Sequence, residues 1–275
     1  MKRIIVIFII GLMFYGCETQ PPVSAGGEIT IIGADSVIAV NYQPNLSAIK
    51  KVPLVEDFAN VSCMPCATSN KILESLIGIV FGRSNVATIK YPANFPSPND
   101  PFYLANPTAC NARLSYYNVY TAPCNIVDGI LKPAPTDSND VKTKINSRLL
   151  TSANVSLVVT DSIGGDSFFV RYFVYVKDTS AIDFSQYVCN VAVTETNITF
   201  ASAPGANGET EFYDIMRVMF PTDKQTYSFN KLQNTLLVNQ REVKISSTWN
   251  KEKLHAVVFL QNKSTKEVIQ AATSY

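Results

Sequence analysis

Two cysteines separated by two residues, Cys63 and Cys66, are the side chains in this sequence best suited to chemistry. Cysteines at this spacing can close a small disulfide ring and reopen it, because a thiolate attacks disulfides and a thiol does not. An apolar, strand-like run (52–58) precedes the pair and a helix-like run (72–80) follows it. The first cysteine therefore lies at a helix N-terminus, where free backbone N–H groups favour a thiolate. The pattern predicts thiol–disulfide chemistry at Cys63.

A second candidate, Asp57, lies within the apolar run, six residues before Cys63. Burial raises the proton affinity of a carboxylate, so Asp57 beneath the pair could accept the proton of Cys66 when that thiol attacks a mixed disulfide. The alternative is a solvated residue at the end of the strand. We favour the base, because an acid between apolar neighbours is costly without a reason. Glu56 points the other way in a regular strand.

The start of the chain predicts a cell-envelope location. Lys2 and Arg3 precede an apolar run that ends at Gly16, which is typical of a secretory signal peptide (1–16) and too short to span a bilayer. The stretch 14–17 resembles the bacterial lipoprotein box, which implies that Cys17 is lipidated and becomes the first mature residue. The alternative is a secreted protein with a cysteine near its cleavage site. Residues 17–27 form a polar tether with Pro and Gly.

Composition narrows the function further. The formal net charge is +1 and the charges form no basic block, so the chain has no footprint for nucleic acid. A hydrophobic fraction of 47%, with 15 Phe and 13 Tyr, can fill a real core. The length after the tether suits two modest domains, which we expect at 28–150 and 151–275.

In the first domain, strand-like and helix-like runs alternate, which predicts a central sheet flanked by helices. A proline-rich loop (92–101) follows the strand 86–91, and Ile126–Val127 ends in a turn at Asp128-Gly129. Residues 138–140 cap a last helix with apolar positions at 141, 145 and 149. The remaining expected strands are 29–32, 37–40 and 52–58, and the remaining expected helices are 63–80 and 102–117, the latter interrupted at Pro107.

The second domain changes period. Short apolar or alternating runs begin near residue 155 and continue to 269. Turn signals such as Gly164-Gly165, Pro204-Gly205 and Asn207-Gly208 separate several of them, and no run has a convincing helical period. This pattern predicts an all-β sandwich.

Asp57-Phe58, then Cys63-Met64-Pro65-Cys66, a helix, and a later Ala122-Pro123 before a strand resemble the thioredoxin fold. The resemblance implies that Cys63 attacks, Cys66 resolves and Asp57 is the buried acid. It also implies that Pro123 is a cis-proline facing the disulfide, and that Ala122 and Met64 contact the substrate. Base rates alone favour an ordinary trans proline.

A narrower resemblance covers most of the chain. The stretches 99–102, 113–117, 122–123, 127–129 and 254–271 are similar to the Omp-twenty-eight-related family of outer-membrane lipoproteins. This implies an α/β thioredoxin-like domain followed by an all-β, Ig-like sandwich, on an outer-membrane lipoprotein that faces the periplasm. Some members of that family use the fold only as a scaffold.

The other candidates are weaker. Cys110 and Cys124 could form a structural disulfide or remain buried thiols, and Cys124 could serve as a third redox cysteine beside Pro123. Cys189 is expected in the core and His255 on an exposed strand. A zinc site of four cysteines would need a second close-spaced pair, which the sequence lacks. We therefore expect no metal and no cofactor.

Two functions remain. The first is a lipid-anchored envelope thiol–disulfide oxidoreductase, whose partners are protein thiols and disulfides. The second is a non-catalytic lipoprotein in which the disulfide is static and the β domain binds a partner.

Overall fold

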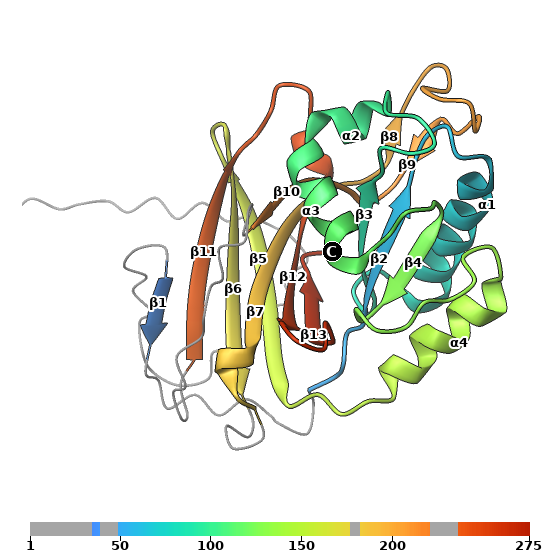
Figure 1. The fold of residues 1–275 in the computed structure, drawn as a ribbon. Helices are drawn as coiled ribbons and strands as arrows, with labels where there is room; N and C mark the ends of the chain where they lie inside the picture. Colours follow the sequence, from blue (N-terminus) through green and yellow to red (C-terminus); the bar gives the residue numbers. More distant parts are fainter. Residues whose placement is uncertain (1–34, 39–48, 177–181, 221–235) are drawn as a thin grey trace, which may run out of the picture.

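The computed structural model describes residues 35–38, 49–176, 182–220 and 236–275 of the 275-residue chain (Figure 1). The predicted signal peptide (1–16), Cys17, the tether (17–27) and the predicted strand 29–32 lie outside the described residues, as do residues 39–40 of the predicted strand 37–40. Among the described residues, no helix is both long and apolar enough to cross a membrane.

Strands and helices alternate up to residue 150, as the sequence predicts. The helix expected over 102–117 is divided at Asn106, because Pro107 lacks a backbone N–H and is tolerated at the start of a helix rather than inside one. The last helix is capped by Asp137, one residue before the expected cap. The elements are β1 (Asp35–Ile38), β2 (Leu54–Ala59), α1 (Met64–Leu73), the π-helix η2 (Glu74–Phe81), β3 (Ala87–Pro92), α2 (Pro101–Ala105), α3 (Pro107–Tyr117), β4 (Cys124–Val127) and α4 (Ser138–Leu149).

After residue 150 the described residues form strands and two short 3-10 turns. They are β5 (Val155–Gly164), β6 (Ser167–Val176), η3 (Phe184–Gln186), β7 (Tyr187–Glu195), β8 (Ile198–Thr199), β9 (Glu211–Phe212), β10 (Ile215–Phe220), β11 (Leu236–Lys244), η4 (Lys251–Lys253), β12 (Leu254–Asn262) and β13 (Val268–Thr273).

The strands form one mixed seven-stranded sheet, in the order β13-β12-β7-β10-β3-β2-β4, and two antiparallel sheets. The antiparallel sheets are β1-β11-β6-β5 and the short pair β8-β9. In the large sheet, β10 runs antiparallel to β7 and parallel to β3, with Ile215 opposite Lys90. Strands from both sides of residue 150 are therefore hydrogen-bonded into one sheet, and the fold is mixed α/β.

The two faces of the large sheet pack against different layers (Figure 1). On one face, Leu54 and Phe58 of β2 share a core with α3. On the other face, Val55 shares a core with the α1–η2 helix and α4. Where the sheet continues into β7 and β12, its residues share a third core with β5 and β6 of the four-stranded sheet. Because side chains alternate between the two faces of a strand, the strands of the large sheet contribute residues to three separate cores.

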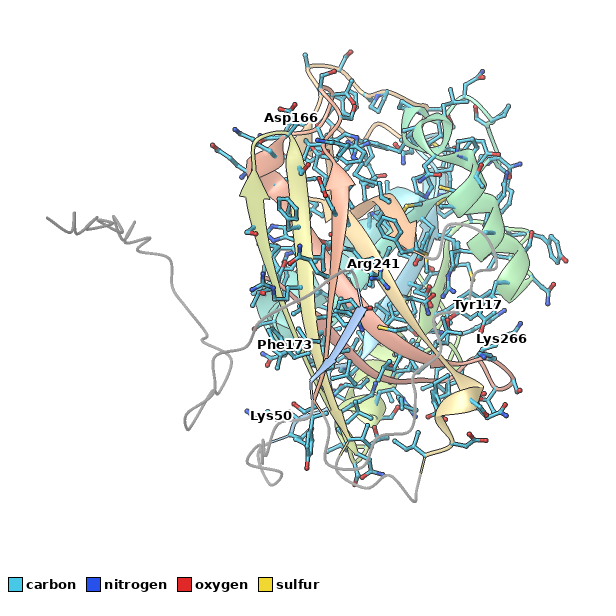
Figure 2. The ribbon with its side chains drawn as sticks, turned by 90° about the vertical axis from the view of Figure 1, so that its left-hand side faces the viewer. Lys50, Tyr117, Asp166, Phe173, Arg241 and Lys266 are labelled. Carbon is cyan, nitrogen blue, oxygen red and sulfur yellow. A yellow bond between two sulfur atoms is a disulfide. The ribbon has the colours of Figure 1, made fainter. Side chains whose placement is uncertain are left out.

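A buried polar cluster joins α3 to strands from both parts of the chain. Nε of Arg113 donates to Oε1 of Glu56 at 3.0 Å, and Nη1 of Arg113 donates to Oε1 of Gln261 at 3.1 Å. Nε2 of Gln261 donates to the hydroxyl of Tyr117 at 2.6 Å. Lys266 lies beside Tyr117 in the side-chain view (Figure 2), with Nζ 5.9 Å from the ring centroid. Glu56 points away from the face that carries Asp57, as strand alternation predicts.

Candidate functional site

A disulfide joins Cys63 to Cys66 at the start of α1. Cys63 is the N-cap of this helix and carries no side-chain cap, so the helix begins at the cysteine itself. Its backbone N–H donates to the carbonyl of Asn60 at 3.0 Å, and its carbonyl accepts from the N–H of Cys66 at 3.1 Å. Pro65 is placed in the first turn, where a missing N–H costs nothing. The pair therefore lies at the N-terminal end of the helix dipole.

Three segments hold the loop between β2 and Cys63. The side chain of Asn60 donates to the carbonyls of Ala93 at 2.7 Å and Ser97 at 2.8 Å. Asp100 accepts from the N–H of Val61 at 2.9 Å while its other oxygen caps α2. From beyond residue 150, the N–H of Asn207 donates to the carbonyl of Val61 at 3.0 Å. Both parts of the chain therefore position the cysteine loop.

The disulfide is almost fully covered. Cys63 is 3% exposed and Cys66 is 0% exposed, and both pack against Ala59 and Ala122. The bond between Ala122 and Pro123 is cis, as the resemblance implies. Met64 projects outward and is 64% exposed. The structure thus brings the cysteine pair together with the segment before Pro123 and leaves Met64 on the surface beside it.

Asp57 lies in a buried polar layer on the α1 face of the sheet. Its neighbours across the sheet are Lys90 on β3 and Asn125 on β4. Nζ of Lys90 is 3.4 Å from Oδ2 of Asp57, and Nδ2 of Asn125 donates to Oγ of Ser69 on α1 at 3.4 Å. Asp57 is 0% exposed, and neither of its oxygens makes a hydrogen bond among the described residues.

Burial raises the pKa of Asp57, and the positive charge of Lys90 opposes that rise. The solvated position at the end of the strand is therefore not the one observed. Lys90 was not among the predicted site residues, although it is the lone charge in the apolar strand β3. The parallel pairing of β2 with β3 places Lys90 opposite Asp57. The charge of Lys90 in an apolar strand is the sequence signal that could have marked it as a site residue.

The remaining cysteines lie away from this layer. Cys110 and Cys124 are free thiols that pack in the core between α3 and the sheet, and Cys189 is buried in the core between the sheets. Burial raises the pKa of Cys110 to about 12 and also raises the pKa of Cys124. Cys124 alternates with Asn125, so it faces the side of the sheet opposite Asp57. Both thiols are therefore held in their unreactive form.

His255 is half-buried rather than exposed, and its ring stacks on Tyr275 with centroids 3.7 Å apart. Within residues 49–176, 182–220 and 236–275, no three His, Cys, Asp or Glu side chains are grouped so that they could hold a metal ion.

No protein-family model and no curated protein matches this sequence. Two solved structures are similar in fold. HBP35 of Porphyromonas gingivalis has a TM-score of 0.68 at 13% identity, over 82% of this chain and 75% of that chain. Protein AGR_C_4864 from Agrobacterium tumefaciens has a TM-score of 0.50 at 16% identity, over 82% of this chain and 95% of that chain. At these identities the similarity concerns the fold alone.

Proposed function

We propose that this protein is a lipid-anchored thiol–disulfide oxidoreductase of the cell envelope. The observation that carries the proposal is the Cys63–Cys66 disulfide at the first turn of α1, on the same face of the sheet as the fully buried Asp57. In this proposal, residues 28–150 form a thioredoxin-like domain and residues 151–275 an Ig-like sandwich. The order of β2, α1, β3 and β4 supports the assignment of the first domain.

The reaction begins with the thiolate of Cys63, which attacks one sulfur of a substrate disulfide. The substrate S–S bond breaks, one substrate sulfur leaves as a thiolate, and a mixed disulfide forms at Cys63. Cys66 then loses its proton and attacks the sulfur of Cys63. This step releases the second substrate thiolate, so the substrate gains two electrons and the protein pair becomes a disulfide. The same steps in reverse oxidise a substrate dithiol.

Asp57 is the group that takes the proton of Cys66. Burial without hydrogen bonds raises the pKa of the Asp57 carboxylate, which makes it a better acceptor for the proton of Cys66 than a solvated aspartate. Lys90 stabilises the ionised form of Asp57 and keeps it available as a base. Met64 and Ala122 border the pair and would contact the substrate chain.

One observation favours the second function, a scaffold with a static disulfide. Cys63 is only 3% exposed, so a protein substrate has little access to its sulfur atom. The two functions therefore differ in one measurable property, which is whether the reduced pair exchanges with an external disulfide.

The test uses the purified chain without its signal peptide. The chain is incubated in mixtures of reduced and oxidised glutathione, and its free thiols are then labelled with maleimide and counted by mass spectrometry. We expect the reduced fraction of the Cys63–Cys66 pair to change with the composition of the mixture. We also expect Cys66→Ser to accumulate a mixed disulfide with glutathione at Cys63, because the resolving thiol is missing. Cys63→Ser is the matched control and should accumulate far less adduct at the buried Cys66.

A pair that stays oxidised in all glutathione mixtures, together with no adduct on Cys66→Ser, would establish the scaffold instead. The location is tested separately. We expect labelled palmitate to enter the wild-type chain in cells and Cys17→Ser to be unlabelled and released from the membrane fraction. Labelling of the variant would contradict the anchor at Cys17.

A further inference from the structure

A cavity of about 520 Å³ lies between the α1–η2 helix, β3 and residues 207–214. We propose that this cavity binds an amino acid or a short peptide, with the carboxylate of the ligand against Lys90 and its ammonium toward the acidic mouth. Its volume falls in the range of small-molecule sites, which is about 300–1,000 Å³. Neither Cys63 nor Cys66 lines it, so the site does not depend on the proposed redox activity.

Two polar side chains at the floor of the cavity, Thr88 and Lys90, have unused hydrogen-bonding capacity among the described residues. Thr88 and Lys90 alternate along β3 and therefore share a face. Thr88 is 7% exposed and its hydroxyl makes no hydrogen bond among the described residues. Lys90 is 8% exposed, and its ammonium has three donors, with Asp57 at 3.4 Å as its ion-pair partner. A buried hydroxyl and a buried ammonium with unused donors are the groups that a carboxylate satisfies.

The raised pKa of Asp57 strengthens this argument. When Asp57 holds a proton, the charge of Lys90 has no ionised partner there, and a ligand carboxylate supplies one. Asn70 adds an acceptor at the wall, because its Oδ1 atom has no hydrogen bond among the described residues. Its Nδ2 atom is already used, since it donates to Glu209 at 2.9 Å.

The mouth of the cavity is acidic. Glu209 and Glu211 line it without a cationic partner within the described part of the chain, whereas Glu74 and Asp214 are paired with Arg83. A ligand ammonium would supply the cationic partner that these two carboxylates lack among the described residues. Leu73, Ile77 and Ile79 provide an apolar wall for a ligand side chain. A molecule that carries an anion at one end, a cation at the other and apolar groups between them matches all three surfaces.

The test measures binding of glycyl-L-leucine by titration calorimetry, using the Cys63→Ser/Cys66→Ser variant so that redox chemistry plays no part. We expect saturable binding that weakens at least about 10-fold for glycyl-L-leucinamide, which lacks the carboxylate. N-acetylglycyl-L-leucine, which lacks the ammonium, should also bind more weakly. Thr88→Val is nearly isosteric and should weaken binding about 2- to 12-fold through one hydrogen bond.

Lys90→Met should abolish binding, whereas Lys71→Met is the matched control. Lys71 lines the same cavity but is exposed, so its loss should change affinity less than about 2-fold. Absence of saturable binding by glycyl-L-leucine, L-leucine and glycylglycyl-L-leucine would overturn the proposal. Equal binding of the peptide and its amide would overturn it too, as would wild-type affinity in both Thr88→Val and Lys90→Met.

Discussion

Nζ of Lys90 lies 3.4 Å from Oδ2 of Asp57, and this ion pair is the only polar contact of the Asp57 carboxylate among the described residues. We predict that Asp57→Asn stabilises the oxidised protein by about 1–3 kcal/mol at pH 8, because it removes a buried and poorly satisfied charge. Urea unfolding at fixed redox state measures this. Asp166→Asn changes an exposed carboxylate and should stay within about 0.5 kcal/mol of wild type.

The extra stability of Asp57→Asn should depend on pH, because the pKa of Asp57 is raised in the folded protein. The folded protein binds the proton more tightly than the unfolded chain, whose value is 3.8. The contribution of Asp57 to stability is therefore complete below pH 3.8 and is lost as the pH rises through the folded-state pKa. The advantage of Asp57→Asn should vanish at pH 3.5 and grow toward pH 8. A difference that is constant with pH would show that the pKa of Asp57 is the same in the folded and unfolded states.

Arg113 is predicted to be the most costly single truncation in the cluster between α3 and the sheet. Arg113→Ala leaves Glu56 buried and unpaired, so we expect a loss of about 3–5 kcal/mol in the free energy of unfolding. Arg171→Ala is the matched control, because Arg171 is exposed and donates to Gln240 at 3.1 Å. A loss below about 1 kcal/mol for Arg113→Ala would contradict the cluster's structural role.

His255 is the single histidine of the chain, so its ring can be titrated by NMR without ambiguity in an untagged protein. Burial, together with the positive charges of Arg83 and Lys253, lowers its pKa to about 4. The folded state favours the neutral ring, so stability is lost as the pH falls from 6.5 toward 4, on the order of 1 kcal/mol after solvent screening. A ring that titrates near 6.5 would show that His255 is solvated.

Gly205 lies against the cysteine loop, where an added Cβ would be 2.3 Å from the carbonyl oxygen of Val61. We expect Gly205→Ala to cost about 1–3 kcal/mol through this clash. The variant should also be reduced faster by dithiothreitol, because the loop before Cys63 is loosened. Ser202→Ala, at an exposed position in the same loop, should leave both quantities unchanged. An unchanged reduction rate in Gly205→Ala would argue against this support of the disulfide.

The local elements were predictable because they depend on short-range patterns. Apolar spacing predicted α4, where Val141 and Ile145 are buried, and Pro107 marked the division between α2 and α3. Alternation predicted that Asp57 and Glu56 face opposite ways. The runs after residue 150 were correctly expected to be strands, and the described residues there contain no long helix.

The long-range pairing was not predictable from these patterns. The strand at 215–220 was expected, but its parallel pairing with β3 depends on contacts between residues far apart in the sequence. The same distance concealed the partners of Asp57 and Glu56, which are Lys90 and Arg113. Single-strand periodicity cannot choose a neighbour, because every half-buried strand carries the same alternation.

The position of β10 between β7 and β3 bears on how such a chain can evolve. A gene rearrangement that replaced everything after residue 150 with another sandwich would remove β10 from beside β3 and leave that edge of β3 unpaired and open to aggregation. It would also remove Asn207, and with it one of the three supports of the cysteine loop. Selection therefore acts on the two parts as a single inherited unit, and neither is free to be shuffled alone.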